Sequence, residues 1–277
     1  MAALPAARRL IVNADDFGRS PSVNAAVARA HREGILTSAS LMVNEPGCAE
    51  AVALARENPR LGVGLHLTLL AGHSALPPER IPGLADACGR FSDSPVATGW
   101  RYYFRHDLRE PLQAEIAAQF ERFAATGLPC DHVNGHLHLH LHPVILPMVL
   151  ENATRRGIKR LRLTRDPFLL NAAMAGGRWL YRISHTVIFG ALARRAYPLL
   201  QQRGFRCTDA VFGLQQNGRV DEEFLCRLLP LLPAGDSELY SHPALTESQC
   251  EFDALVSPRV KAMVGEQTVQ LIRYRDL

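Results

Sequence analysis

The order of apolar runs is the feature of this sequence that most restricts its fold. Over the first two-thirds of the chain, short strand-like runs alternate with runs whose apolar residues recur at helical spacing. Strand–helix–strand alternation with short connections predicts an α/β fold with a parallel sheet, open or closed into a barrel. We expect strands at 9–14, 36–43, 61–69, 132–142 and 158–164, and helices at 22–34, 47–59, 107–127 and 143–157.

One expected strand is unusually rich in histidine. The stretch HVNGHLHLHLHP, residues 132–143, places histidine or asparagine at every even position and valine, glycine or leucine between them. In a strand, this alternation would put imidazoles on one face and aliphatic side chains on the other. A bare surface strand would rarely use histidine so consistently, so the pattern points to a site.

Polar residues follow several of the expected strands. Asp15 and Asp16 end the first strand, His66 lies near the end of the third, residues 136–142 close the fourth, and His242 follows the late strand in ELYSHP. Ligands of parallel α/β folds collect at the carboxyl ends of the strands. We therefore expect these side chains to converge.

The residue types in this set suit metal-assisted hydrolysis. One carboxylate and two imidazoles are a common ligand set for a catalytic divalent ion, and we expect Asp16, His66 and His136 to supply it. Asp15 would be the general base toward a metal-bound water, and His242 the acid for a leaving amine. Hydrolysis of an amide is the expected reaction. Zinc fits the ligands best, with magnesium, nickel, cobalt and iron left open.

Four further residues are expected to line a pocket beside the metal: Asn13, His138, His140 and Tyr240. Simpler roles stay open for several of the candidates. One aspartate of the pair could cap the helix that follows, and His66 could be a hydrogen-bonded core residue. His140 and His142 could form only a polar wall.

Two other functions are compatible with two histidines and a carboxylate. One is a non-haem iron oxygenase, although such an enzyme needs no acid–base pair like Asp15 and His242. The other is metal storage or sensing, which usually closes the coordination sphere of the ion. The open placement of single ligands at separate strand ends favours hydrolysis over both.

Composition narrows the class of protein. The 277 residues are 47% hydrophobic, and 31 basic residues against 27 acidic ones give a net charge of +4 without a concentrated basic stripe, so nucleic acid is not an expected partner. The six cysteines are dispersed, which suggests reduced thiols in a cytoplasmic protein. We expect no secretory signal and no membrane span. The sequence does not predict the oligomeric state.

Five ordered blocks carry a family resemblance: IVNADDFG, TSASLMVN, VGLHLTLLAG, HVNGHLHLHLHP and LYSHP. In order and spacing they resemble the YdjC-like carbohydrate deacetylases. The resemblance implies a single TIM-barrel-like domain over 1–277 and metal-dependent removal of acetyl from N-acetylated amino sugars. It places the metal histidines on His66 and His136. Similarity to related polysaccharide deacetylases makes Asp15 the base and Asp16 the ligand, the reverse assignment being the alternative.

The histidine block departs from the usual family pattern. Where the family has DSHHHVH, this chain has NGHLHLH, so Asn134, Gly135 and Leu137 replace Asp, Ser and His. This departure, with a helical insertion at about 167–204, resembles the branch associated with hopanoid biosynthesis. It implies an N-acetylglucosaminyl hopanoid, a glycolipid, as the substrate. The alternative is a soluble N-acetylated oligosaccharide such as chitobiose.

The insertion itself is strongly apolar. Residues 168–200 intersperse arginines among aromatic and aliphatic residues, which suits a helix lying at a membrane surface. This predicts a cytoplasmic protein with peripheral contact to the inner membrane through 168–200. The alternative is a pair of ordinary helices packed on the barrel.

Overall fold

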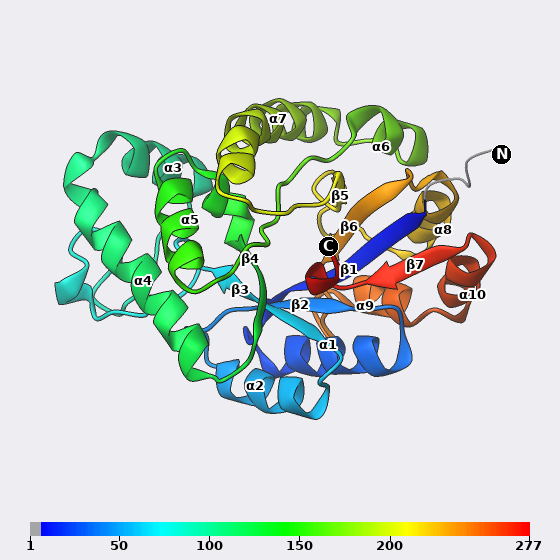
Figure 1. Cartoon of the computed structure of the whole chain (residues 1–277), viewed down its shortest axis with the longest axis horizontal. Helices are drawn as coiled ribbons and strands as arrows, with labels where there is room; N and C mark the ends of the chain where they lie inside the picture. Colours follow the sequence, from blue (N-terminus) through cyan, green and yellow to red (C-terminus); the bar gives the residue numbers. More distant parts are fainter. Residues whose placement is uncertain (1–6) are drawn as a thin grey trace.

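The computed structural model describes residues 7–277, and its centre is a curled parallel sheet with helices around the outside (Figure 1). The strand order is β4-β3-β2-β1-β6-β5, and β7 also pairs with β1. This is the incomplete form of the expected barrel. The strands are β1 (Arg8–Phe17), β2 (Ser38–Leu41), β3 (Gly62–Leu67), β4 (Cys130–Gly135), β5 (Ala210–Phe212), β6 (Gly235–Ser241) and β7 (Val269–Ile272).

The helices cover the convex side and both ends of the sheet. In Figure 1, α1 and α2 lie along one edge, α4 and α5 beside β3 and β4, and α8 to α10 near the other edge. Helix α1 begins after Ser20, whose side chain accepts a hydrogen bond from the backbone N–H of Val23. The helices are α1 (Pro21–Glu33), α2 (Cys48–Glu57), α3 (Pro95–Phe104), α4 (Arg109–Ala125), α5 (Ile145–Arg155), α6 (Phe168–Met174), α7 (Trp179–Gln202), α8 (Glu222–Leu231), α9 (Gln249–Val256) and α10 (Pro258–Glu266).

The sheet is buried on both faces, which explains its apolar runs. Strand β1 is central, pairing with β2, β6 and β7, and its residues from Leu10 onward are buried. The sequence pattern did not predict two strands of the sheet, β5 and β7. They are only three and four residues long, too short to show a period of their own.

The prediction that residues 132–142 form one strand is wrong beyond Gly135. The chain turns there into the 3-10 helix η3 (His136–Leu141), in which Leu137 and His138 take left-handed backbone angles, φ 48° and 58°. A Cβ at position 135 would lie 3.1 Å from the Cβ of His140, so glycine permits this tight return. The imidazoles therefore point in several directions and do not share one face.

The expected strand at 158–164 is an extended segment with single bridges. Leu161 bridges Val133 of β4, and Arg160 bridges Arg206. The sheet is therefore irregular between β4 and β5, and the chain leaves it there to form α6 and α7. These two helices correspond to the insertion expected at about 167–204. Within residues 7–277, no helix is long and apolar enough to cross a bilayer.

Candidate active site

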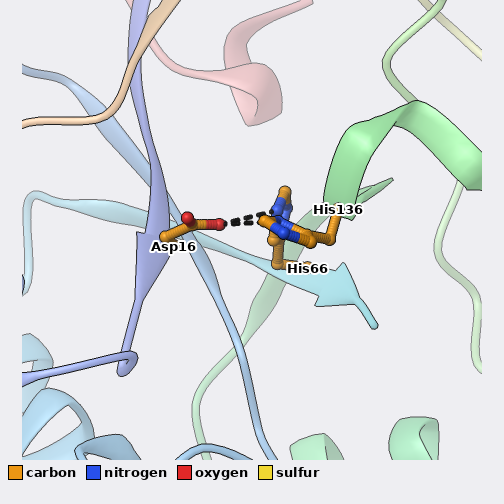
Figure 2. A group of neighbouring side chains, drawn as sticks. All are labelled: Asp16, His66 and His136. Carbon is orange, nitrogen blue, oxygen red and sulfur yellow. Dashed lines mark hydrogen bonds and ion pairs between the residues drawn. The ribbon is translucent and has the colours of Figure 1, made fainter. Parts of the chain in front are cut away.

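Three side chains from different parts of the sheet meet at one point, as Figure 2 shows. Asp16 comes from β1, His66 from β3 and His136 from the start of η3. Oδ1 of Asp16 lies 2.9 Å from Nδ1 of His136 and 3.2 Å from Nε2 of His66. The three ligand atoms lie within 4.8 Å of one another, and all three residues are buried. The structure thus brings together the three residues expected to hold a metal.

An irregularity in β1 lets two consecutive aspartates face the same site. Neighbouring residues of a regular strand point to opposite faces. Here the pairing with β2 shifts register between Ala14 and Phe17, and Asp16 takes a left-handed φ of 64°. Such an angle is uncommon for a non-glycine residue and is typical of functional sites. It turns the Asp16 carboxylate toward the histidines while Asp15 also points inward.

The ring of His66 lies between Asn134 and Asp16, and the orientation of the Asn134 amide decides which ring nitrogen carries the proton. Nδ1 of His66 donates to Oδ1 of Asn134 at 2.7 Å, which leaves a lone pair on Nε2. That Nε2 is buried and faces Oδ1 of Asp16 at 3.2 Å, the position from which both atoms could bind one cation. Turning the Asn134 amide over would instead set its nitrogen against Nδ1 and its oxygen 3.1 Å from Nη2 of Arg162. Metal binding through Nε2 requires the first orientation.

Asp16 also contacts a cation of the chain itself. Nη1 of Arg19 donates to Oδ2 of Asp16 at 2.7 Å, on the side away from the histidines. Burial alone would raise the pKa of Asp16. The neighbouring His136 and His66 lower this pKa by more than burial raises it, so the net pKa lies well below its ordinary value. The carboxylate is therefore ionised, as a cation ligand must be.

Asp15 is held by a bidentate ion pair with Arg162, a residue that the sequence did not single out. Nη1 and Nη2 of Arg162 donate to Oδ2 and Oδ1 of Asp15 at 2.7 and 2.9 Å. Asn13 donates to the same Oδ1 at 2.9 Å. Burial would raise the pKa of Asp15, but the charge and hydrogen bonds of Arg162 hold it well below the usual range.

Arg162 is shared between two buried carboxylates. Its Nε and Nη2 donate to Oε1 of Glu238 at 2.9 and 2.7 Å, and the ring of Tyr240 lies 4.5 Å from the guanidinium. Two sequence signals could have revealed this pairing. Arg162 is an arginine in the apolar alternation RLRL, and Glu238 stands two residues before Tyr240 in the same strand.

His242 stands at the mouth of the site, and its side chain is 28% exposed. Its backbone N–H donates to Oε2 of Glu251 at 2.5 Å, and its Nδ1 lies 4.0 Å from the same oxygen. Glu251 is fully buried on α9 and also accepts from the backbone N–H of Val220 at 3.2 Å. This carboxylate fixes the loop that carries His242 and was another residue missed in the sequence.

The four expected pocket residues separate into two groups. His138 and Tyr240 line a cavity and are hydrogen-bonded to each other, with Nε2 2.9 Å from the hydroxyl. Asn13 and His140 are fully buried and line neither cavity described below. Nε2 of His140 lies 2.9 Å from the backbone oxygen of Arg162, and burial lowers its pKa to about 3. Both therefore support the site from behind.

Two cavities meet at the acid–base candidates. A smaller cavity of about 370 Å³ is lined by Asp16, His136 and Arg19 among others, and an apolar cavity of about 690 Å³ lies between α3, η3 and α7. Asp15 and His242 line both. A buried carboxylate and a partly exposed imidazole thus border both cavities.

The chain is similar to known proteins over nearly its whole length. The sequence matches the family model described as YdjC-like protein over residues 9–266. It is 40% identical to the carbohydrate deacetylase of Geobacillus stearothermophilus, over 97% of this chain and 98% of that protein. It is 32% identical to the chitooligosaccharide deacetylase of Serratia marcescens, with the same coverage. A crystal structure of a candidate cellobiose-phosphate cleavage protein from Enterococcus faecalis superposes with a TM-score of 0.74 at 25% identity, covering 98% of both chains.

Proposed function

This chain belongs to the YdjC-like protein family, and from that premise we propose that it hydrolyses the acetamide group of N-acetylated amino sugars. The observation that carries the proposal is the placement of Asp15 and His242 at the junction of the two cavities, beside Asp16, His66 and His136. Deacetylation needs a base for water, an acid for the amine and a means to stabilise an oxyanion.

The metal is part of the proposal. Asp16, His66 and His136 would hold one divalent ion, and zinc fits two imidazoles and one carboxylate. When bound there, such an ion would polarise the acetyl carbonyl and lower the pKa of a water molecule. The closeness of the three ligand atoms, with Nε2 of His66 facing the ionised Asp16, supports this fit.

The residues of the chain would carry the proton transfers. Asp15 would take a proton from the attacking water as the new C–O bond forms. His242 would give a proton to the sugar nitrogen as the C–N bond breaks, so that acetate and a free amine leave. Arg162 keeps Asp15 ionised and fixes the direction of its oxygens.

The names of the two relatives favour a soluble substrate. One relative is a carbohydrate deacetylase and the other a chitooligosaccharide deacetylase, and both match almost the whole chain. We therefore propose N-acetylated oligosaccharides such as chitobiose as the first substrate class to test.

A specific observation favours a second class, sugars linked to a lipid such as a hopanoid. The cavity of about 690 Å³ that leads to Asp15 is mostly apolar, whereas an oligosaccharide presents hydroxyl groups on most sides. Its lining includes Val96, Trp100, Leu139, Ile188 and Phe189. Several apolar side chains around it are exposed, among them Leu180 at 89%. They suit contact with a membrane surface that presents such a lipid.

Acetate release tests the function and separates the two substrate classes. Purified protein loaded with zinc would receive chitobiose and N-acetylglucosaminyl hopanoid in parallel. Turnover of chitobiose alone removes the lipid from the proposal, and preference for the hopanoid supports it. Absence of acetate from both substrates, with metal demonstrably bound, contradicts the deacetylase.

The Asp15→Asn variant tests the assignment of the two aspartates. It should keep the metal and lose about 10³-fold in kcat, in the range that general bases contribute. Bound metal is measured by elemental analysis and kcat by acetate release. Loss of metal together with activity would reverse the roles of Asp15 and Asp16.

A further inference from the structure

A hydrogen-bonded path runs from the end of the described chain to Asp15. The 3-10 helix η4 (Tyr274–Asp276) follows β7 and lies at the middle of the curled sheet in Figure 1. The Tyr274 hydroxyl donates to Oε2 of Glu238, and the other oxygen of that carboxylate accepts from Arg162. Arg162 in turn holds Asp15 by two hydrogen bonds.

From this path we propose that Glu238 and Tyr274 are positioning residues for Asp15, acting through Arg162. The proposal rests on the proposed role of Asp15 as the general base. Neither residue lines either cavity, and both are fully buried, so neither can touch a substrate. Any effect they have on the reaction must pass through Arg162.

The guanidinium is fixed from three sides. Its Nη2 donates to both carboxylates, to Glu238 at 2.7 Å and to Asp15 at 2.9 Å, so the plane of the group cannot rotate without breaking bonds to one of them. The Tyr240 ring lies 4.5 Å from it on one face. With Glu238 removed, Arg162 could turn about its last bonds, and the Asp15 oxygens would lose their direction.

Tyr274 is itself held firmly in place. Its ring stacks on that of His132, with centroids 4.1 Å apart and planes 16° apart. The turn that carries it is closed by Arg273 and Asp276, each of which bonds to the backbone or side chain of the other. The hydroxyl therefore reaches Glu238 from a rigid support.

Fold stability alone does not require this arrangement. Two carboxylates and one guanidinium are almost entirely buried here, and well-packed apolar side chains of similar volume are often as stable or more stable. Burial raises the pKa of Glu238 against the opposing effect of Arg162, which shows the strain of keeping this group charged. A role in directing Asp15 accounts for charges that packing does not need.

Two conservative variants and a matched control test the proposal. Tyr274→Phe removes one hydroxyl, and Glu238→Gln removes one charge at nearly constant shape. The control is Tyr102→Phe, which removes another buried tyrosine hydroxyl, bonded to the backbone oxygen of Leu69 at 2.9 Å and outside this path. A merely structural loss would affect Tyr274→Phe and the control alike.

For positioning residues we expect kcat to fall while KM and bound metal stay constant, by about 5-fold in Tyr274→Phe and about 50-fold in Glu238→Gln. The double variant should lose no more than Glu238→Gln alone, because both changes act on the same guanidinium. Losses that multiply, or a Tyr274→Phe variant as active as the control, would overturn the proposal.

A second measurement does not depend on acetate release. It therefore distinguishes failure of the positioning proposal from failure of the proposed deacetylase function. The Nε–H of Arg162 should give a slowly exchanging proton signal in NMR, identified by its absence in Arg162→Lys. In Tyr274→Phe its exchange should be at least about 10-fold faster, whereas the control should match the unaltered protein. Equal exchange in all three proteins would overturn the proposal even if no substrate is turned over.

Discussion

Two regions of the molecule that meet at Asp15 are built in opposite ways. The polar floor, which we define as Asp15, Asn134, Arg162, Glu238 and Tyr274, is buried and its charged groups are paired by hydrogen bonds. The apolar wall, which we define as the side chains of α3, η3 and α7 that line the apolar cavity, includes large hydrophobic groups exposed to solvent. Both border the same candidate site.

The contrast reflects where each region lies relative to the sheet. Floor residues come from strands or from segments bonded to them, where neighbouring chains fix each side chain. Wall residues come from helices that follow β3 and β4 or leave the sheet after residue 166, with Val96 71% and Ile188 53% exposed. Under the proposed function, the reacting groups lie in the hydrogen-bonded floor, and substrate preference would lie with wall side chains that can vary without disturbing it.

The largest expected effect comes from breaking the metal site beside the floor. His136→Ala removes one of three ligand atoms, so we expect loss of the bound ion and a fall in acetate release of about 10³-fold or more, with either substrate. Elemental analysis and acetate assays measure the two effects. An enzyme that keeps full activity after losing its metal would show that the floor works alone.

A change in the wall should act on one substrate class only. Ile188→Gln places an amide in the apolar cavity and removes an aliphatic contact that a bound lipid would bury. Loss of roughly 1.4 kcal/mol from this contact corresponds to about a tenfold higher KM for a lipid-linked sugar. Turnover of chitobiose should stay within twofold.

The matched control for this change is Val187→Gln. Val187 is the preceding residue of α7, is 66% exposed and does not line the cavity, so both substrates should be unaffected. Equal effects of Ile188→Gln on both substrates would mean that the wall does not distinguish lipid from oligosaccharide.

The two regions also differ in how far the sequence could predict them. Strand-end placement correctly predicted that Asp16, His66 and His136 converge, because parallel strands align their carboxyl ends at one edge. The same pattern failed after Gly135, where alternation continued in the sequence but the backbone did not remain extended. Alternate side chains point to opposite faces only while the backbone stays in the β region. The left-handed residues 137 and 138 end that alternation.

Asp15 was predicted as a site residue, but its pairing with Arg162 and Glu238 was not, because these partners are far apart in the chain. Arg162 and Asp15 are separated by 147 residues, and Arg162 and Glu238 by 76. Nothing near Arg162 or Glu238 in the sequence links them to Asp15, and only the closure of the sheet brings the three together. Pairing of buried charges is a tertiary property that local periodicity does not contain.

The smallest effect on activity is expected where the wall joins the sheet, at Asp166. This buried carboxylate accepts from the backbone N–H of Gln215 at 3.0 Å and from the side chain of Asn171. Burial raises its pKa from 3.8 to about 7. The unfolded chain therefore ionises Asp166 at lower pH than the folded chain does, so its stabilising effect is complete below about pH 4 and is lost as the pH rises to about 7.

Asp166→Asn removes this titration, so the stability of the unaltered protein relative to the variant should fall between pH 4 and 7 and then level off. The change should be a few kcal/mol at most, because one pKa unit between the folded and unfolded chain corresponds to about 1.4 kcal/mol. Urea unfolding at pH 5 and pH 8 measures it, with the exposed Asp93→Asn as control. Stability curves that run parallel for the two proteins would mean that Asp166 is ionised in the folded protein, so that a charge joins the wall to the sheet. Activity should change less than twofold in either case, because Asp166 lines neither cavity.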